Sequence, residues 1–194
     1  MSSLDTSNNL FTLAEFKDFI GVLSTYTTED TKFEDYINAS SWYLKQAFDR
    51  PIKAQSLTEY HDGTGQNQIF TRAYPIMCVI TLYSDADRTF ASTNLLSSST
   101  YQTYTDEGMI ILTDDVFDIG ERVIKLTYRA GWDTIPYDIK LAGLEYAELL
   151  YEKYKHHRIG LTSVTDSSGS RSYFAEVPKS VLNIIESYRK KVIW

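Results

Sequence analysis

Apolar residues recur at helical spacing in two segments near the start of the chain. Thr12 followed by Glu15 has the pattern of a capping box, which predicts that the first helix begins there. Thr31 and Glu34 repeat this pattern before the second segment, and Arg50-Pro51 is expected to end it. The predicted buried stripes are Leu13, Phe16, Ile20 and Leu23 in the first helix, and Phe33, Ile37, Leu44 and Phe48 in the second. A short polar connector would make the two helices an αα-hairpin.

Beyond the second helix the spacing of apolar residues becomes that of strands. Segments 56–60 and 68–71 flank Asp62-Gly63, a pair that tolerates left-handed backbone, so they are predicted to form a hairpin. The run 76–83 is rich in β-branched and aromatic residues and predicts a strand, which Asp85-Ala86-Asp87 is expected to end.

Further strand patterns follow in the middle of the chain. Segments 101–104 and 109–112 flank the turn residues Asp106-Glu107-Gly108 and predict a second hairpin. In 122–128 apolar and polar residues alternate, which indicates a strand with one buried and one exposed face. These segments predict an antiparallel β-unit inserted between helical segments.

The stretch 128–136 is predicted to be a corner where the β-unit leads into a helix. Gly131 can adopt the positive φ needed to leave a strand sharply, and Pro136 has the fixed φ that suits a first helical turn. Tyr128 and Trp132 are expected to hold the corner in place by their burial. Gly131→Val should therefore damage folding or assembly.

The longest helical pattern follows the corner. Its predicted apolar stripe is Ile139, Ala142, Tyr146, Leu149 and Leu150. Cationic residues and Gly160 are expected to end this helix. Residues 163–172 are rich in Ser and Gly and predict a mobile loop, and Pro178 begins a final helix. The inward residues of the final helix are predicted to be Val181, Leu182, Ile185 and Tyr188.

The element order predicts an α+β fold, a small bundle of about four helices with an antiparallel β-unit between helix two and helix three. We expect one domain, residues 1–194, with the helical bundle formed by 10–55 and 134–194 and the β-insertion by 56–133.

Composition narrows the class of protein. Of the 194 residues, 43% are apolar and 23% charged, which is typical of a globular protein and excludes global disorder. The formal net charge of −7 argues against a broad basic face for nucleic acid. No apolar run approaches the roughly 20 residues that span a bilayer, and the N-terminus lacks a signal-peptide pattern. The single cysteine, Cys78, excludes an intrachain disulfide and is predicted to be buried and inert.

The 15 tyrosines form an unusually large set. Tyrosine is large, rigid and amphipathic, so it suits half-buried strands and subunit interfaces equally well. Both interpretations remain open from the sequence.

The candidates for metal chemistry are three aspartates and two histidines. Asp114, Asp115 and Asp118 lack the spacing of a calcium loop, which favours solvated turn carboxylates. The adjacent His156 and His157 would point about 100° apart on a helix, whereas a helix C-terminus favours their charge. The sequence also lacks a nucleophile elbow, a phosphate loop and a dinucleotide fingerprint. We therefore predict no catalytic, cofactor-binding or metal-binding residues and no enzymatic activity.

The order of these parts resembles a known family, the head–tail connector (adaptor) proteins of tailed bacteriophages, in the long form of the gp6-like family. The resemblance spans about residues 10–190, and the strongest motif is the run 123–132 with its Tyr-Arg-Ala-Gly-Trp ending. The other matching segments are 13–21, 60–65, 74–76, 135–142 and 158–160.

The resemblance implies a structural virion protein without cofactors. Copies would assemble into a homo-oligomeric ring, expected to be a dodecamer, that docks on the portal protein and carries a downstream stopper or tail-completion protein. DNA would pass through the lumen without sequence-specific binding. The expected location is the virion neck at the portal vertex, after synthesis in the host cytoplasm. Because a head-to-tail ring needs two complementary patches, an uncovered apolar face is expected on the monomer.

Two segments are predicted to contact the portal or a neighbouring copy. The segment 163–174 is either a floppy connector or a loop that orders on a partner. The tail 189–194 either frays or helps to dock the portal, and the resemblance favours docking. The predicted contact residues are Ser163, Ser168, Gly169, Arg171, Tyr173, Phe174, Arg189, Lys190 and Trp194.

Two other functions are weighed against the adaptor. A tail-completion or stopper protein of the neck would share the helical-bundle architecture but bind tail components. A small metal-dependent hydrolase would need the aspartates and histidines named above.

Overall fold

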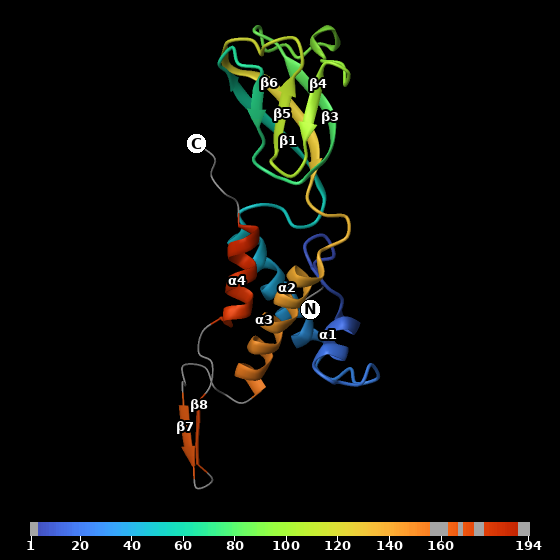
Figure 1. Cartoon of the computed structure of the whole chain (residues 1–194). Coiled ribbons are helices and arrows are strands. Elements are labelled where there is room, and N and C mark those ends of the chain that lie inside the picture. Colours follow the sequence, from blue (N-terminus) through green and yellow to red (C-terminus); the bar gives the residue numbers. More distant parts are fainter. Residues whose placement is uncertain (1–3, 156–162, 167–168, 173–176, 190–194) are drawn as a thin grey trace. The chain divides into compact units, whose positions relative to one another are not determined.

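The computed structural model describes residues 4–155, 163–166, 169–172 and 177–189 (Figure 1). The chain divides into two compact units. One unit consists of Met1–Asp49 with Ile135–Trp194, and the other is Arg50–Thr134. Among the described residues, no helix has both the length and the apolar character needed to cross a membrane.

The first unit is a bundle of helices. Its elements are α1 (Leu13–Phe19), α2 (Asp30–Phe48), α3 (Tyr137–Lys155) and α4 (Lys179–Tyr188). Helix α2 packs against each of the other three, and α3 also packs against α4. The strands of the second unit lie between α2 and α3 in the chain, so the predicted α+β fold with an inserted β-unit is confirmed.

Aromatic rings fill much of the bundle core. Phe33 lies edge-on to Phe16 and to Tyr151, with ring centroids 5.7 and 5.3 Å apart. Tyr43 and Tyr146 join α2 to α3 with a centroid distance of 4.5 Å. Several of the tyrosines therefore belong to the interior or its margin, where their rings pack against other rings.

The first helix begins as predicted but ends early. Thr12 and Glu15 form both bonds of the capping box. The helix ends at Phe19, however, and Leu23 is 76% exposed, so the predicted fourth position of the stripe is wrong. Gly21 has a φ of 70°, a conformation that breaks the helical repeat before Leu23.

The second predicted capping box is wrong. The backbone N–H groups of Lys32 and Phe33 both donate to the carbonyl of Glu29, so α2 is already under way at Thr31. A residue of α1 contacts the first turn of α2 and the segment before it. Lys17 is buried, forms an ion pair with Asp30 at 2.6 Å and donates to the Tyr26 carbonyl at 2.7 Å. At its other end α2 stops at Asp49, with a φ of 54°, before Arg50-Pro51 as predicted.

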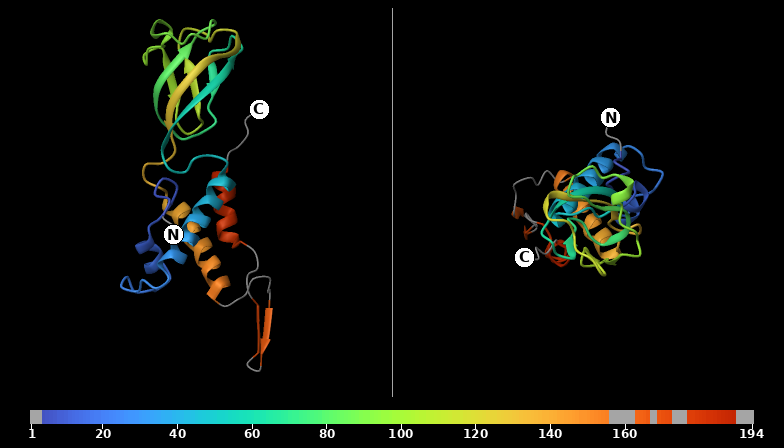
Figure 2. Two further views of the ribbon diagram at one scale, coloured as in Figure 1. Left: turned by 180° about the vertical axis from the view of Figure 1, so that it is seen from behind. Right: turned by 90° about the horizontal axis from the view of Figure 1, so that it is seen from above.

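The second unit is built from two three-stranded antiparallel sheets. The strands are β1 (Gln55–Gly63), β2 (Gln68–Phe70), β3 (Ile76–Ser84), β4 (Tyr101–Tyr104), β5 (Met109–Leu112) and β6 (Gly120–Ala130). One sheet has the order β1-β6-β3, and the other β2-β5-β4. Figures 1 and 2 show the two sheets facing each other.

The core of the β-unit lies between these sheets. Ile69, Ile110 and Leu112 from one sheet pack with residues from the other in one buried cluster. Along β6, Ile124, Leu126 and Tyr128 are fully buried while Lys125 and Thr127 lie on the opposite face, which confirms the predicted alternation. The remaining members of the cluster are Ala73, Ile76, Leu82, Phe117, Val123 and Ala130.

The predicted hairpin around Asp62-Gly63 is wrong, because β1 pairs with β6 whereas β2 pairs with β5 in the other sheet. Gly63 shows why the turn signal misled. It is the last residue of β1, opposite Gly120, and a Cβ there would lie 1.6 Å from the Asp118 carbonyl oxygen. The glycine serves close packing between strands instead of a tight turn. The hairpin of β4 and β5 is confirmed.

The predicted burial of Cys78 is also wrong, because its side chain is exposed. It lies on β3, an edge strand whose pairing with β6 is shifted between Ile76 and Cys78 and again between Val79 and Thr81. These irregularities turn residues of an apolar run outward, and Ile80 is 53% exposed.

The C-terminal part differs from the prediction in three places. Strands β7 (Ser163–Asp166) and β8 (Gly169–Ser172) pair with each other, so the segment predicted as a mobile loop contains a two-stranded ribbon. In α4, Val181 is buried and Tyr188 stacks on Phe48, but Leu182 is 44% exposed and does not point inward. In α3, Leu149 and Leu150 are only half-buried. The predicted helix end at Gly160 lies outside the described residues.

Candidate assembly site

The corner predicted at Gly131 is where the chain that enters the β-unit, residues 52–54, lies against the chain that leaves it, residues 131–132. Gly131 has a φ of 107°, and a Cβ there would lie 2.7 Å from the Lys53 carbonyl oxygen. Its N–H donates to the Pro75 carbonyl at 3.0 Å. Both the backbone conformation and the close approach therefore require glycine.

Trp132 also binds the entering segment, residues 52–54. Its N–H donates to the Ile52 carbonyl at 2.8 Å, and its carbonyl accepts from the Ala54 N–H at 3.1 Å. The Arg50 guanidinium lies over the Trp132 ring, 5.0 Å from its centroid. Trp132 is half-buried rather than fully buried, and Pro136 accepts the first helical bond of α3 from Lys140, as its predicted position implies. The angle that the corner was expected to set between the two units stays a prediction.

Tyr128, the fourth corner residue, is the centre of a buried polar network. Its hydroxyl donates to Glu59 Oε1 at 2.6 Å and accepts from the Ala73 N–H at 3.0 Å. The other carboxylate oxygen of Glu59 accepts from the Arg72 N–H at 3.1 Å and lies 3.1 Å from His61 Nε2. The network thus ties β1 and β6 to the segment between β2 and β3.

The environment fixes the protonation of this network. Burial opposes the ionisation of Glu59, but His61, the Tyr128 hydroxyl and the Arg72 N–H outweigh it, and the pKa of Glu59 lies below its usual 4.5. Burial raises the pKa of Tyr128, and the neighbouring Glu59 carboxylate raises it further. Tyr128 is therefore the donor and Glu59 the charged acceptor.

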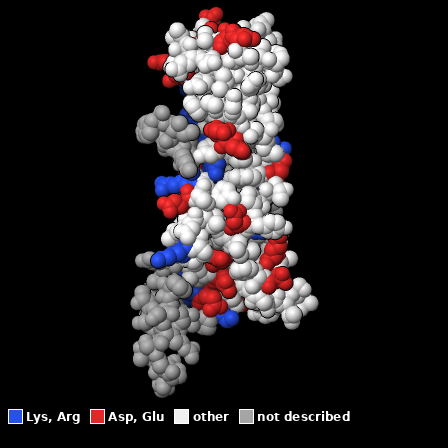
Figure 3. Space-filling model, in the orientation of Figure 1, with Lys and Arg blue, Asp and Glu red and all other residues white. Residues whose placement is uncertain are grey.

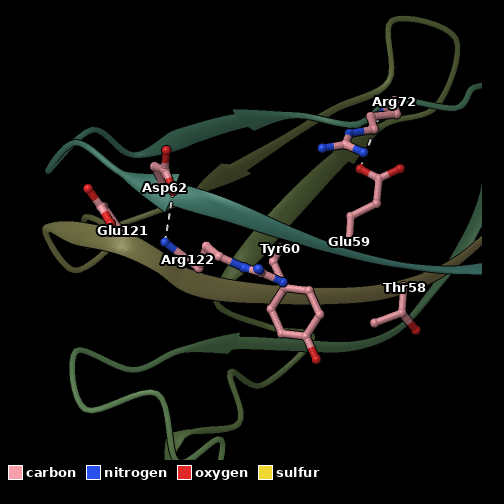
Figure 4. A pocket seen from close by; sticks show the side chains of 7 residues that line it. All are labelled: Thr58, Glu59, Tyr60, Asp62, Arg72, Glu121 and Arg122. Atoms are coloured by element: carbon pink, nitrogen blue, oxygen red, sulfur yellow. Dashed lines mark hydrogen bonds between the residues drawn. The ribbon is translucent and has the colours of Figure 1, made fainter.

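A polar hollow of about 550 Å³ is lined by residues of β1, by the start of β6 and by Arg72 (Figure 4). Tyr60 and Glu59 extend to opposite sides of β1, and the Arg122 side chain reaches the Tyr60 ring. Two of the three carboxylates of the hollow accept from the backbone, Asp62 from the Arg122 N–H at 2.8 Å and Glu59 from the Arg72 N–H at 3.1 Å. The complete lining is Thr58, Glu59, Tyr60, Asp62, Arg72, Glu121 and Arg122.

The residues weighed for metal chemistry do not come together where the structure describes them. Asp114 and Asp115 are exposed, and Asp118 accepts from the Ser84 hydroxyl at 2.8 Å. Within the described part of the chain, no group of three His, Cys, Asp or Glu side chains is placed to hold a metal ion. His156 and His157 lie outside that part.

Most of the predicted partner contacts cannot be placed. Ser163, Gly169 and Arg171 belong to the β7–β8 ribbon, and Arg189 follows the last residue of α4. Ser168, Tyr173, Phe174, Lys190 and Trp194 lie outside the described residues. All nine remain predicted contacts.

Exposed apolar side chains occur on both units. Ile119 is 78% and Val116 55% exposed on the β-unit, and Tyr137 is 88% exposed on α3. The face of the β-unit seen in Figure 3 is mostly uncharged, with acidic side chains gathered at its ends. Such surfaces are available for contacts with other proteins.

Sequence reasoning missed Glu59 and its network. The sequence carried one signal. Glu59 alternates with Leu57 and His61 along a predicted strand, so all three lie on its inward face. A charge at such a position requires a buried partner, but nothing in the sequence indicates that Tyr128, 69 residues away, supplies it.

Comparison with known proteins gives one family match and several similar structures. The model of a family described as "Head completion protein" matches residues 9–191. A chain from the virion of a native gene transfer agent (GTA) particle superposes with a TM-score of 0.65 at 15% identity, over 100% of this chain and 95% of that chain. Two chains from GTA particle necks, one native with C12 symmetry and one empty with C6 symmetry, give a TM-score of 0.64 over the same shares, at 15% and 14% identity. No match was found among curated proteins.

Proposed function

The chain belongs to the head completion protein family, and we propose that it is a structural component of a virion neck. The observation that carries this proposal is the family match over residues 9–191, which includes both units of the chain. The match agrees with the resemblance to head–tail connector proteins found in the sequence. The similar fold of chains from GTA necks, with almost complete coverage of both chains, supports the same location.

Within the neck, the chain acts as the adaptor between the portal and the next neck or tail component. Copies form a ring, which the C12 and C6 symmetries of the similar neck structures support, and twelve is the expected number. DNA passes through the lumen. The net charge of −7 suits this role because a protein with an excess of acidic residues binds the phosphate backbone weakly.

The proposal assigns no chemical step to the chain. Its polar groups act mechanically: the Glu59–Tyr128 network ties β1 and β6 to the segment between β2 and β3, and Gly131 lets residues 52–54 lie against residues 131–132. A rigid β-unit presents a fixed surface to neighbouring proteins, which an assembly protein requires.

Deleting the gene and mixing purified components test this function. Without the chain, particle production should stop at DNA-filled heads and separate tails, and the added protein should restore joining. The purified chain should bind isolated portal. Binding to tail components alone would instead indicate a tail-completion or stopper protein, and normal particles in the deletion strain would refute a neck function altogether.

A further inference from the structure

The outer face of the β1-β6-β3 sheet carries an ordered row of side chains. Tyr60 on β1 lies opposite Lys125 on β6, and Lys125 lies opposite Tyr83 on β3. Phe90 packs on both tyrosines, with ring centroids 5.7 Å from Tyr60 and 6.1 Å from Tyr83. Together with Arg122, these four residues are called the aromatic–cation patch below.

The position of Phe90 is built into the fold. Its φ is 50°, which is rare for a bulky residue and persists only where the surroundings impose it. The Asp85 carboxylate imposes it, because it accepts from the Phe90 N–H at 2.6 Å, the Thr89 hydroxyl at 2.7 Å and the Asp87 N–H at 3.0 Å. The ring is thus held over the row before any partner arrives.

The two cations of the patch lie on its rings. Lys125 Nζ is 5.4 Å from the Phe90 centroid and 5.8 Å from that of Tyr83, and Arg122 Cζ is 4.8 Å from that of Tyr60. The ion pairs found among the described residues involve neither Arg122 nor Lys125. Both cations can therefore accept an external anion while staying in contact with the rings.

This arrangement favours a carboxylate-bearing protein surface over a base or a sugar. The cations occupy ring faces, and the rings of Tyr60 and Tyr83 are inclined by 59° and 70° to Phe90, so the patch offers no flat platform for stacking. Two cations in a chain of net charge −7 are also too few to track a phosphate backbone.

A matching surface exists on α3 of the same chain. Residues 137, 141, 145, 148 and 152 follow at helical spacing and form one stripe, called the α3 stripe below. It begins with Tyr137, 88% exposed, and Leu141, 47% exposed, and continues with three glutamates. Burial raises the pKa of Glu148, and the neighbouring Glu152 and Glu145 raise it further. A cation that approaches the stripe would therefore stabilise the charged form of Glu148.

We propose that the aromatic–cation patch of one copy docks on the α3 stripe of a second copy. Lys125 and Arg122 pair with Glu148 and Glu152, whereas Glu145 accepts from the Ser180 hydroxyl of α4 at 2.5 Å. The rings of the patch cover the exposed apolar part of the stripe. The contact uses two different surfaces, so it is heterologous and repeats from copy to copy, as a closed ring needs. The inference rests on the proposed ring function and names the surfaces that build the ring.

Charge reversal in the full chain tests this contact by sedimentation velocity over a range of protein concentrations. The wild-type chain should self-associate, more weakly at high salt. Lys125→Glu with Arg122→Glu should weaken self-association at least about tenfold. Arg129→Glu is the matched control, because Arg129 lies on the same face of β6, outside the patch, in an exposed ion pair with Asp133.

The reciprocal reversal makes the test specific. Glu148→Lys with Glu152→Lys should abolish self-association in the same way, and mixing this variant with the patch variant should restore it. Circular dichroism establishes that each variant is folded.

Several results would overturn the inference. These are a wild-type chain that stays monomeric at all concentrations, patch variants that associate like the wild type, and reversed variants that fail to associate with each other. Binding of a DNA duplex that depends on Lys125 and Arg122 would reassign the patch to phosphate and overturn it as well. Neck incorporation is scored separately: patch variants that enter necks normally refute only this contact, whereas a wild-type chain absent from necks refutes the proposed function.

Discussion

Tyr128→Phe is predicted to destabilise the β-unit by roughly 2–4 kcal/mol. The substitution removes one oxygen atom and keeps the ring, so it leaves no cavity in the core. That oxygen is both the donor to Glu59 at 2.6 Å and the acceptor for the Ala73 N–H at 3.0 Å. Two hydrogen bonds between segments distant in sequence are therefore lost together.

The magnitude follows from the two groups that remain. The Ala73 N–H would be left buried without an acceptor, which costs about 1–3 kcal/mol, and a hydrogen bond to a charged group is worth about 1.5–3 kcal/mol. Glu59 keeps the Arg72 N–H as a donor at 3.1 Å, so its loss is partial and the total stays below the full sum. Burial of Glu59, which is 8% exposed, keeps water from replacing the hydroxyl.

Urea-induced unfolding of the full chain, followed by near-ultraviolet circular dichroism, measures the change in unfolding free energy. Because the chain has two compact units, hydrogen exchange of the amides in the β4–β5 hairpin, which keep their own partners in the variant, should accompany it to report on the β-unit alone. Tyr104→Phe is the control, since Tyr104 lies in the same unit and is 41% exposed. It should change stability by less than about 0.5 kcal/mol. If Tyr128→Phe has an equally small effect, the network does not hold the segment between β2 and β3 on the β1-β6-β3 sheet, and the prediction is wrong.

Three further predictions concern other points of the fold. Gly131→Val should cost at least roughly 2–4 kcal/mol in urea unfolding, because its φ of 107° is strained for valine and the Cβ would meet the Lys53 carbonyl; unchanged stability would show that the corner adapts. Asp30→Ala should cost roughly 3–5 kcal/mol, because it leaves the buried Lys17 ammonium without its carboxylate; Asp30→Asn, which keeps the shape, should recover only part of this in thermal unfolding. Since the folded pKa of Glu59 lies below its usual 4.5, its charge stabilises the fold above that pH and the contribution is lost as the pH falls through the folded pKa. The stability gap between the wild type and Glu59→Gln should therefore be full at neutral pH and shrink on acidification, and a constant gap would contradict the assignment.

Local signals in the sequence predicted the elements that depend on neighbouring residues. The capping box of Thr12 and Glu15, the hairpin of β4 and β5 and the alternation along β6 each involve contacts within a few positions or one face of a strand. Gly131 and Pro136 likewise marked the corner because backbone conformation is set by the residue itself.

Contacts between distant segments could not be predicted in this way. Gly63 matched a turn signal but serves the approach of Asp118, 55 positions on, and Cys78 matched a buried strand but lies on an irregular edge. Thr31 matched a capping box, yet α2 begins at Asp30, which forms an ion pair with Lys17, 13 positions earlier in the chain. In the candidate site, the alternation of apolar and polar residues along β6 predicted the burial of Tyr128. Its partner Glu59 could not be predicted, because only the folded sheet brings the two residues together.

Imaging the neck shows whether this chain is a structural part of it. Electron cryomicroscopy of purified particles that carry the chain with a tag should place it between head and tail, in multiple copies arranged around the axis. We expect a ring of density into which both the helical bundle and the β-unit fit as separate bodies. Particles whose necks lack the tag, or in which the tag lies on the shell or the tail tip, would show that the chain is not a neck protein.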